Sequence, residues 1–293
     1  MDDRTSLAER FEEDRGHLKA VAYRMLGSAS EAEDALQESW LRAAQADTSG
    51  VENLTGWLTT VVGRVCLNIL RTRRTRREDP LDAYDVRARG TGEGDDPEQE
   101  ALLADSVGLA LLVVLDSLAP AERLAFVLHD MFAVPFDEIG PMLDRSPTAA
   151  RQLASRARRR VKGRTVLPDA DLARRRRVVE AFLAASRGGD FDALVALLHP
   201  DVVLHADRSV VPTPEPVVVR GAHTVARGAM AATGRALFTG VALVDGAVAL
   251  AMAPLGRLRL VLGFTIVDGL VTDIDVVADP DRLIGFEVGF LDS

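Results

Sequence analysis

A helix, a tight turn and a second helix are predicted over residues 119–162, and the polar face of the second helix is strongly basic. Ser146 followed by Pro147 marks the start of that second helix, because a Ser hydroxyl accepts hydrogen bonds from orphan amides and Pro at the first helical position loses none. The preceding segment, 136–143, has the apolar face of a short helix and is followed by a tight break. This order is typical of a helix-turn-helix, in which the second helix enters the major groove of DNA.

The positive charge of the chain is concentrated in particular segments. The formal net charge is −9, so an attraction to nucleic acid does not follow from the overall composition. Residues 147–177 nevertheless hold eleven Arg or Lys side chains against Asp169 and Asp171. We interpret this local excess as part of a nucleic-acid-binding surface. A solvated basic helix without a partner is the alternative interpretation.

The whole sequence sets limits on the class of protein. Its 293 residues suit two or three domains. There is no run of about twenty apolar residues, and the N-terminus is polar, so we expect no membrane span, no secretory signal and a cytoplasmic location. The single cysteine, Cys66, excludes an internal disulfide and a Cys-rich zinc site. The five histidines are scattered, and zinc needs three or four converging ligands, so we expect no metal and no other cofactor.

The first 78 residues are predicted to form one helical unit. Ser6 with Glu9, and Ser30 with Glu33, have the capping-box spacing, in which the two side chains satisfy amide donors at a helix start. The helices predicted here are 7–26, 31–46 and 53–77. The third helix is apolar on one side, and its other side carries a polar stripe at helical spacing. The members of that stripe are Thr60, Arg64, Asn68 and Arg71.

Residues 79–100 are predicted to be a linker. They are polar, mostly acidic where charged, and interrupted by Gly and Pro, without periodicity. Helices are predicted to resume at 98–117 and 120–132, ahead of the helix-turn-helix.

The pattern changes beyond Lys162, where a short connector and two helices precede a series of strands rich in Val and Leu. The predicted helices are 172–187 and 190–198, and the predicted strands are 201–205, 215–220, 236–244, 247–252, 257–267 and 270–277. Asp245-Gly246 and Asp268-Gly269 are strong hairpin signals. Helices followed by consecutive strands indicate an α+β domain, shaped as a cone in which a curved antiparallel sheet wraps around helices.

Four segments carry a resemblance to a known family: 22–28, 34–42, 57–64 and 118–161. In their order and spacing they resemble domains 2 and 4 of an extracytoplasmic-function (ECF) family RNA polymerase sigma factor of the SigJ type. Such a sigma factor is the polymerase subunit that selects promoters. The resemblance implies a multidomain chain with two all-α domains. Its implied parts are domain 2 over 1–78, a flexible acidic linker over 79–100, domain 4 over 101–164 and a C-terminal regulatory domain over 165–293.

The C-terminal part resembles a SnoaL-like domain of the ketosteroid-isomerase superfamily, which SigJ-type sigma factors carry. The segment that supports this resemblance, and that we take as the regulatory candidate, consists of Asp279, Pro280, Asp281, Arg282 and Leu283. Two other signatures of these proteins are not evident. Residues 166–170 are a displaced form of one, and residues 207–216 stand where the other, a Gly-rich segment, would lie. We therefore expect regulation by this domain to differ in detail.

The resemblance implies three contact surfaces. In the family an acidic helix docks on core RNA polymerase, and the candidates here are Asp34, Gln37 and Glu38; a solvated acidic face is the alternative. The candidates for contact with the melted minus-ten promoter strand are Asn53, Trp57, Thr60, Arg64, Asn68, Arg71, Arg73 and Arg74. The candidates for contact with the minus-thirty-five promoter duplex are Ser146, Thr148, Arg151, Gln152, Ser155, Arg156, Arg158 and Arg159.

Residue chemistry suggests different roles within these surfaces. Arg151 and Gln152 suit guanine and adenine edges, whereas Arg158 and Arg159 suit phosphates, which fix register without specifying sequence. Trp57 is either a core residue or a platform on which a base stacks.

The C-terminal superfamily includes enzymes, but we do not expect catalysis. Isomerase chemistry of this type uses a carboxylate base with a Tyr oxyanion donor, and both tyrosines, Tyr23 and Tyr84, lie far upstream. His205, Asp207 and His223 could line a pocket without reacting. We therefore expect a sigma factor, bound to core RNA polymerase and promoter DNA and modulated in cis by its C-terminal domain, whose small-molecule ligand, if any, is unknown. The alternative is a helix-turn-helix transcription regulator with a ligand-sensing C-terminal domain, for which the unit over 6–78 has no purpose.

Overall fold

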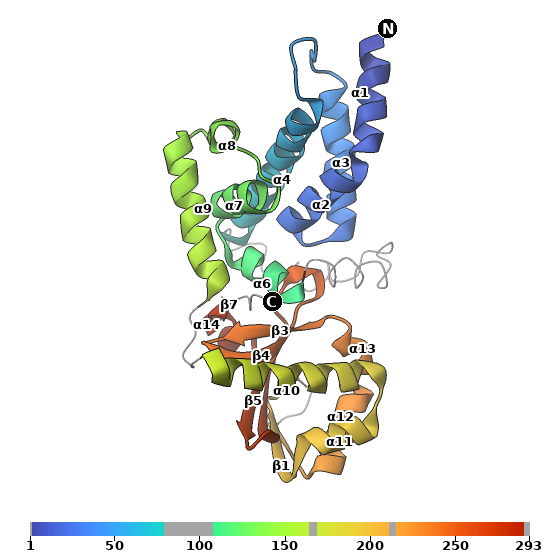
Figure 1. The fold of residues 1–293 in the computed structure, drawn as a ribbon, viewed down its shortest axis with the longest axis vertical. Helices are drawn as coiled ribbons and strands as arrows, with labels where there is room; N and C mark the ends of the chain where they lie inside the picture. The colour runs from blue at the N-terminus through green and yellow to red at the C-terminus, as the bar shows by residue number, and fades with distance from the viewer. Residues whose placement is uncertain (1, 79–107, 164–168, 211–214, 290–293) are drawn as a thin grey trace. The chain divides into compact units, whose positions relative to one another are not determined.

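The structure is a computed structural model that describes residues 2–78, 108–163, 169–210 and 215–289. The chain divides into two compact units, coloured by residue number in Figure 1. One combines Met1–Leu103 with Leu115–Arg159, and the other combines Ala104–Val114 with Arg160–Ser293. The predicted linker, 79–100, and the first half of the helix predicted over 98–117 lie outside the described residues.

Four helices form the first part of the first unit: α1 (Asp2–Glu13), α2 (Arg15–Leu26), α3 (Ala29–Ala43) and α4 (Leu54–Glu78). Their facing sides are apolar, and Leu18, Met25, Leu36 and Leu58 are fully buried between them. Cys66 also lies inside this core. Burial raises the pKa of its thiol to about 12, which is the behaviour of a structural thiol.

Two helix starts differ from the prediction. The helix predicted over 7–26 is two helices, because the chain breaks at Asp14, whose carboxylate accepts a hydrogen bond from the Thr55 hydroxyl at 2.7 Å. The helix predicted from residue 31 starts at Ala29. Its cap is Ser28 rather than Ser30, since the Ser28 hydroxyl accepts from the Glu31 amide at 3.4 Å.

The first unit continues with the helix-turn-helix region. Its elements are α6 (Leu109–Ser117), α7 (Pro120–Phe126), the π-helical turn η3 (Val127–Met131), α8 (Phe136–Met142) and α9 (Pro147–Lys162). The helix predicted over 120–132 is thus α7 continued by η3. Helices α6 and α9 both cross the division of the chain, because α6 up to Val114 and α9 from Arg160 belong to the second unit.

The second unit is an α+β domain, and the predicted fold class, helical domains followed by α+β, is confirmed. Its helices are α10 (Asp169–Gly188), α11 (Phe191–Leu197), α12 (Ala222–Ala231), α13 (Thr233–Ala236), the 3-10 turn η4 (Pro254–Gly256) and α14 (Pro280–Gly285). Its strands are β1 (Leu198–Ala206), β2 (Val217–Arg220), β3 (Thr239–Val244), β4 (Ala247–Met252), β5 (Leu260–Val267), β6 (Leu270–Val277) and β7 (Val288–Gly289).

The seven strands form one sheet in the order β2-β1-β6-β5-β4-β3-β7. Both predicted hairpins are present, and the Asp and Gly of each turn have positive φ, as two-residue hairpin turns require. The prediction of an antiparallel sheet is wrong, because β1 pairs with β6 in parallel, with Leu204 opposite Ile274. A parallel pair needs a long crossover. The chain between β1 and β6 supplies one, and it includes α12, which was not predicted.

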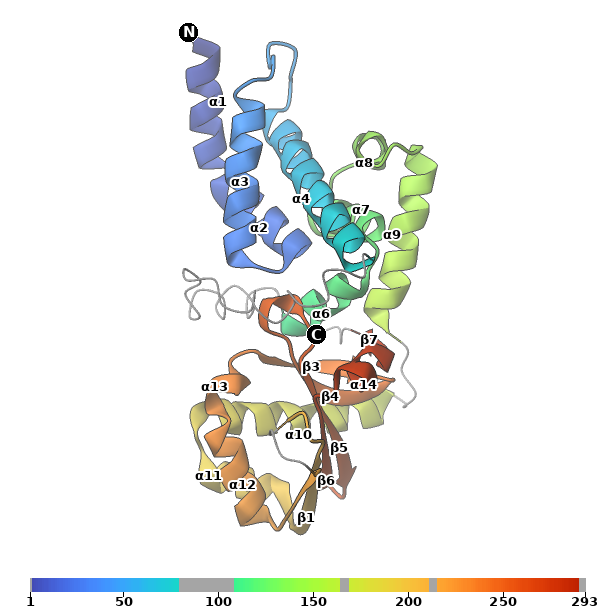
Figure 2. The ribbon, with the colours of Figure 1, turned by 180° about the vertical axis from the view of Figure 1, so that it is seen from behind.

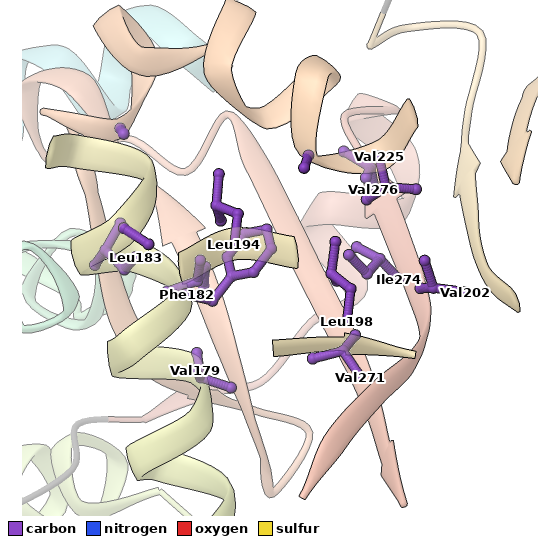
Figure 3. Packing of buried hydrophobic residues seen from close by; sticks show 14 of the residues in the cluster. Val179, Phe182, Leu183, Leu194, Leu198, Val202, Val225, Val271, Ile274 and Val276 are labelled. Carbon is purple, nitrogen blue, oxygen red and sulfur yellow. The ribbon is translucent and has the colours of Figure 1, made fainter. Parts of the chain in front are cut away.

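Helices cover one face of this sheet. Figures 1 and 2 show α10, α11 and α12 on the same side. Figure 3 shows Phe182 and Leu194 from these helices facing Ile274 and Val276 of β6. On the opposite face the side chains are small, and the residues that pack there come from the segments around α6, α14 and β7.

A buried arginine joins the two parts of the first unit. Arg123 of α7 is only 4% exposed. Its guanidinium donates to the Met25 carbonyl oxygen at 2.9 Å and to the Asp116 carboxylate at 3.0 Å. Gly63 of α4 is the second close contact, since a Cβ there would lie 3.2 Å from a methyl carbon of Leu128. The helix-turn-helix region therefore packs directly on α2 and α4.

We expect Arg123→Met to destabilise the protein by about 2–3 kcal/mol, because it leaves the Met25 carbonyl and the Asp116 carboxylate without their charged donor. Urea denaturation followed by helical circular dichroism measures this loss. Arg174→Met is the control, since the Arg174 side chain is 65% exposed and should change stability little. Equal losses for the two variants would contradict the role of Arg123.

Candidate functional site

Helix α9 is held so that one side faces the protein and the other faces outward. Ser146 caps it, as predicted, because its hydroxyl accepts from the Ala149 amide at 3.2 Å. The buried side consists of Ala150, Ala154, Ala157 and, at the end, Val161. Alanines at this spacing bring the helix backbone close to its neighbours. The arginines of the helix are therefore kept off the buried side.

The turn between α8 and α9 depends on two residues with unusual backbone requirements. A Cβ at Gly140 would lie 2.8 Å from the Arg145 carbonyl oxygen, so this position accepts only glycine without a shift of the turn. The Gly140 carbonyl oxygen accepts from the amides of Leu143 and Arg145 at 3.0 Å. Asp144 completes the turn with a φ of 55°, a conformation that Asp tolerates better than most residues.

The candidate duplex-contacting residues lie together along α9. Most are exposed, Ser155 is half-buried, and they differ in what they touch. The Arg151 guanidinium lies 5.3 Å from the centre of the Phe136 ring, and Arg158 is paired with Asp130. The exposed members are Ser146, Thr148, Arg151, Gln152, Arg156, Arg158 and Arg159. Stacking on Phe136 orients Arg151 without neutralising it.

Helix α4 presents the candidate strand-contacting residues. Asn53 is exposed and caps the helix, since its side-chain oxygen Oδ1 accepts from the Gly56 amide at 3.0 Å. Trp57 and Thr60 are both half-buried, and the Thr60 hydroxyl donates to the Trp57 carbonyl oxygen at 2.7 Å. The exposed members are Arg64, Asn68, Arg71 and Arg74.

Arg73 points away from this exposed group. It is ion-paired with Glu31 of α3, and it donates to the Leu26 carbonyl oxygen at 3.5 Å. Its side chain is partly buried. The structure therefore separates Arg73 from Arg64, Asn68 and Arg71, which the sequence had grouped with it.

The exposed group on α4 lines a hollow of about 250 Å³ together with the helix-turn-helix. Arg64, Asn68 and Arg71 form one wall, and Pro141, Met142 and Asp144 form another, with Arg42 and Leu67 completing it. A phosphate that entered this hollow would meet three guanidinium groups and would compete with the Asp144 carboxylate for them. We name this space the α4 hollow.

The acidic face of α3 is exposed as expected. Asp34, Gln37 and Glu38 all lie on it, and Glu38 is ion-paired with Arg42. Leu41 lies on the same face, seven residues after Asp34, and is 62% exposed. Sequence reasoning missed Leu41 because an apolar residue in a helical pattern is normally assigned to the core. A second hollow, lined by Phe11, Leu36, Gln37 and Trp40 among others, lies beside this face.

The segment 279–283 forms the start of α14 and the residues before it. Asp279 caps the helix by accepting from the amides of Asp281 and Arg282, and Leu283 packs on the small-residue face of the sheet. Asp207 holds this segment in place. Its carboxylate accepts from the amides of Ala278 and Asp279 at 2.9 Å. The sequence suggested that Asp207 could line a pocket with His205 and His223, but none of the three lines the apolar cavity of this domain.

Asp207 is ionised more easily than an ordinary aspartate. Burial raises its pKa, but hydrogen bonds from the amides of Asp279, Ala278 and Ser209, together with the charge of Arg282, outweigh this effect and lower the pKa. Its side chain is 14% exposed. The negative charge of Asp207 is therefore part of what fixes the start of α14.

Two negative findings apply to the described residues. No helix among them is long and apolar enough to cross a membrane. No group of three or more His, Cys, Asp or Glu side chains among them is placed to hold a metal ion.

Comparisons with known proteins match both helical regions. Residues 10–76 match the family Sigma-70 region 2, and residues 108–161 match the family Sigma-70, region 4. The ECF RNA polymerase sigma factor SigJ of Mycobacterium tuberculosis is 39% identical over 295 residues, which cover 94% of this chain and 92% of that protein.

Two solved structures are similar to this chain or to part of it. The crystal structure of the Mycobacterium tuberculosis sigma factor SigJ is 34% identical and covers 95% of this chain and 98% of that chain, with a TM-score of 0.44. An NTF2-like protein of unknown function from Mesorhizobium loti is 14% identical and covers 40% of this chain and 99% of that chain, with a TM-score of 0.29.

We expect Asp144→Asn to increase the affinity of the full chain for a short single-stranded DNA by about threefold to tenfold, because it removes the carboxylate that competes with phosphates in the α4 hollow. Asn accepts the positive φ of this position, so the turn is preserved. Fluorescence anisotropy with a labelled oligonucleotide at fixed salt measures the change. Asp137→Asn is the control, since Asp137 is an exposed acid of α8 outside the hollow. An equal gain for both variants would indicate only a change in net charge.

We expect Asp207→Asn to lower the melting temperature at pH 7 and to have a smaller effect in acid. The folded pKa of Asp207 is lowered, so its ionised form contributes stability above the ordinary aspartate pKa of about 3.9. That contribution is lost as the pH falls through the folded pKa. Thermal melting of both proteins between pH 7 and pH 3 measures the gap. The exposed Asp201→Asn serves as the control, and a gap for Asp207 that widens in acid would contradict the assignment.

Proposed function

The chain belongs to the ECF family of RNA polymerase sigma factors and is of the SigJ type, and from this premise we propose how its residues divide the work of promoter recognition. Members of this family are not enzymes. They direct transcription initiation, and their partners are core RNA polymerase and promoter DNA. The proposal assigns the minus-thirty-five duplex to α9, the melted minus-ten strand to α4, and modulation in cis to the C-terminal domain.

The observation that supports this assignment most directly is that an acidic chain carries two separate cationic surfaces, one on α9 and one on α4. Helix α9 exposes only positive charge, and it is capped and turned as a recognition helix. Arg151 and Gln152 lie near its start, where base edges are reached, and Arg158 and Arg159 lie toward its end and suit phosphates. Helix α4 combines Arg64, Asn68 and Arg71, which can bind bases and phosphates of an opened strand.

Core polymerase would contact the acidic face of α3. Asp34, Gln37 and Glu38 are exposed there, and Leu41 adds an apolar centre to the same face. Protein interfaces are commonly organised in this way, with an apolar residue inside a polar rim. We therefore add Leu41 to the polymerase-contacting residues expected from the sequence.

Modulation by the C-terminal domain has a physical basis in the end of α9. Gly163, directly after α9, has a φ of 61°, and a Cβ there would lie 2.9 Å from the Cα of Gly289 in β7. The backbone that leaves the recognition helix thus touches the last strand of the sheet. Ala110 of α6 is buried in the same cluster against which Leu283 packs. Gly163 and Ala110 both belong to the second unit, so these contacts hold the chain segments that lead into and out of the helix-turn-helix region.

The alternative function is a helix-turn-helix transcription regulator with a ligand-sensing C-terminal domain. Such a protein would bind duplex DNA, but core polymerase would not use it to initiate transcription. It would need α9 but not the exposed cations of α4 or the acidic face of α3. In vitro transcription with purified core polymerase separates the two functions.

We expect the full chain to support promoter-dependent transcription with core polymerase, and Arg64→Ala and Arg151→Ala each to lower the RNA product by about tenfold, since one good contact of this kind is worth about 1–3 kcal/mol. Arg151→Ala should weaken binding to the minus-thirty-five duplex, and Arg64→Ala should reduce strand opening measured by permanganate reactivity. The exposed Arg174→Ala is the control. If both variants retain full transcription, the assignment of the two helices fails.

A second arm tests modulation in cis. Gly163→Ala strains a positive φ directly after α9 and brings a Cβ against the Gly289 backbone, so it should change promoter affinity while leaving the affinity for core polymerase unaltered. Gly188→Ala at the end of α10 is the matched control, because nothing lies within 4 Å of its added Cβ. Unchanged promoter affinity in Gly163→Ala would remove the support for modulation through this contact.

A further inference from the structure

The C-terminal domain encloses a cavity of about 240 Å³ between the sheet and the helices that cover it. Eight of the elements already described contribute more than one lining residue, so the cavity is built by the core of the domain and not by a surface loop. The deep wall includes Phe182 of α10, Leu250 of β4 and Ile274 of β6, and Figure 3 shows Phe182 and Ile274 directed into the same interior. We name this space the domain cavity.

The lining of the domain cavity is almost entirely apolar. Valine, leucine and alanine side chains from β1, β2, β5 and α12 complete the walls, and Met252 adds a flexible thioether. A wall of this composition binds apolar ligand surface and excludes an unpaired charge, because burying a charge without a partner is very costly. The chemistry of the walls therefore selects a neutral and mainly apolar molecule.

One polar atom in this wall has no hydrogen-bond partner. Ser186 of α10 is only 6% exposed, and its hydroxyl oxygen makes no hydrogen bond within the described part of the chain. Buried polar atoms in proteins are nearly always paired. Thr239, the other buried hydroxyl of the lining, differs, because it donates to the Arg235 carbonyl oxygen at 2.9 Å. Ser186 is therefore the position from which the cavity can offer a hydrogen bond to a bound molecule.

The domain cavity has an entrance between α12 and α13. The lining residues Thr224, Gly228 and Arg235 are exposed, whereas those of the deep wall are buried or half-buried. Gly228 leaves open space, since nothing lies within 4 Å of a Cβ placed there. Arg187 holds α13 beside this entrance by donating to the carbonyl oxygens of Ala236 and Thr239 at 3.0 and 2.7 Å.

We propose that the domain cavity is a binding site for a small neutral ring compound that carries one hydroxyl or carbonyl oxygen, with that oxygen bonded to the Ser186 hydroxyl. The size fits one or two rings, because an apolar cavity of about 150 Å³ already holds benzene and this one is larger. The site is independent of the promoter-reading surfaces, so ligand binding and transcription can be tested separately.

The test uses 1-naphthol as the probe and 1-methylnaphthalene as its partner without a hydroxyl. Isothermal titration calorimetry on the full chain should show one molecule of 1-naphthol bound. Ser186→Ala should weaken 1-naphthol binding by about fivefold, in line with the loss of one hydrogen bond, and should leave 1-methylnaphthalene binding unchanged. Because Ser186→Ala removes an unpartnered polar atom, it should not lower the melting temperature of the free protein.

Gly228→Phe supplies the second variant, since Gly228 lines the entrance and nothing lies within 4 Å of a Cβ placed there, so a ring at this position can cover the entrance. It should abolish binding of both probes, whereas Gly188→Phe, in similarly open space away from the cavity, should have no effect. The proposal is overturned if the folded protein binds neither probe at 1 mM. It is equally overturned if both probes bind as well to Gly228→Phe as to the unaltered chain, which would place them on an exposed apolar surface. If Ser186→Ala weakened the binding of both probes equally, the proposed hydrogen bond from Ser186 to the bound molecule would be refuted.

Discussion

The close packing of α9 against its own domain is the constraint on which the proposed DNA contacts depend. A helix with so many arginines can be held firmly only if its other side lies near the protein, and Ala150, Ala154 and Ala157 allow that approach. A glycine on each side of the helix then allows close packing of the backbone there. Gly140 brings the preceding turn against the helix start, and Gly163 brings the helix exit against β7. Larger side chains at these positions would displace the helix that carries the cations.

Helix α4 is under a different constraint, because one of its sides is core and the other is a candidate DNA surface. Gly63 allows α7 and η3 to pack on it closely, and Arg123 supplies a buried charge-assisted contact beside them. The same packing brings Asp144 next to Arg64 and Arg71. The Asp144 carboxylate and these arginines thus line the same α4 hollow. If α4 binds an opened strand as we propose, the phosphates of that strand would meet this carboxylate there.

In the C-terminal domain the start of α14 is fixed by a side chain, whereas the interior contains the domain cavity. Asp207 fixes the start of α14 with its charge, and α14 in turn lies on the face that also receives Ala110 and the strand beside Gly163. The opposite face of the sheet, under α10 and α12, is where the domain cavity opens. A molecule bound in the cavity would contact β4 and β5, whose other side chains pack on the face on which Leu283 lies.

Local patterns in the sequence determined most of the helices, the two Asp-Gly hairpins, the helix-turn-helix and the exposure of most of its arginines, because these features depend on spacing and on turn chemistry over a few residues. The family was also visible in short motifs, since several agreed in order. Only the tertiary structure decided features that join distant residues: the parallel pairing of β1 with β6, the pairing of Arg73 with Glu31 away from Arg64, and the exposure of Leu41. It likewise decided that Asp207 holds the segment 279–283 and that Ser186 faces an apolar cavity. The physical reason is that these features depend on contacts between residues that lie tens of positions apart in the sequence. Periodicity and capping signals depend only on residues that are close together in the sequence.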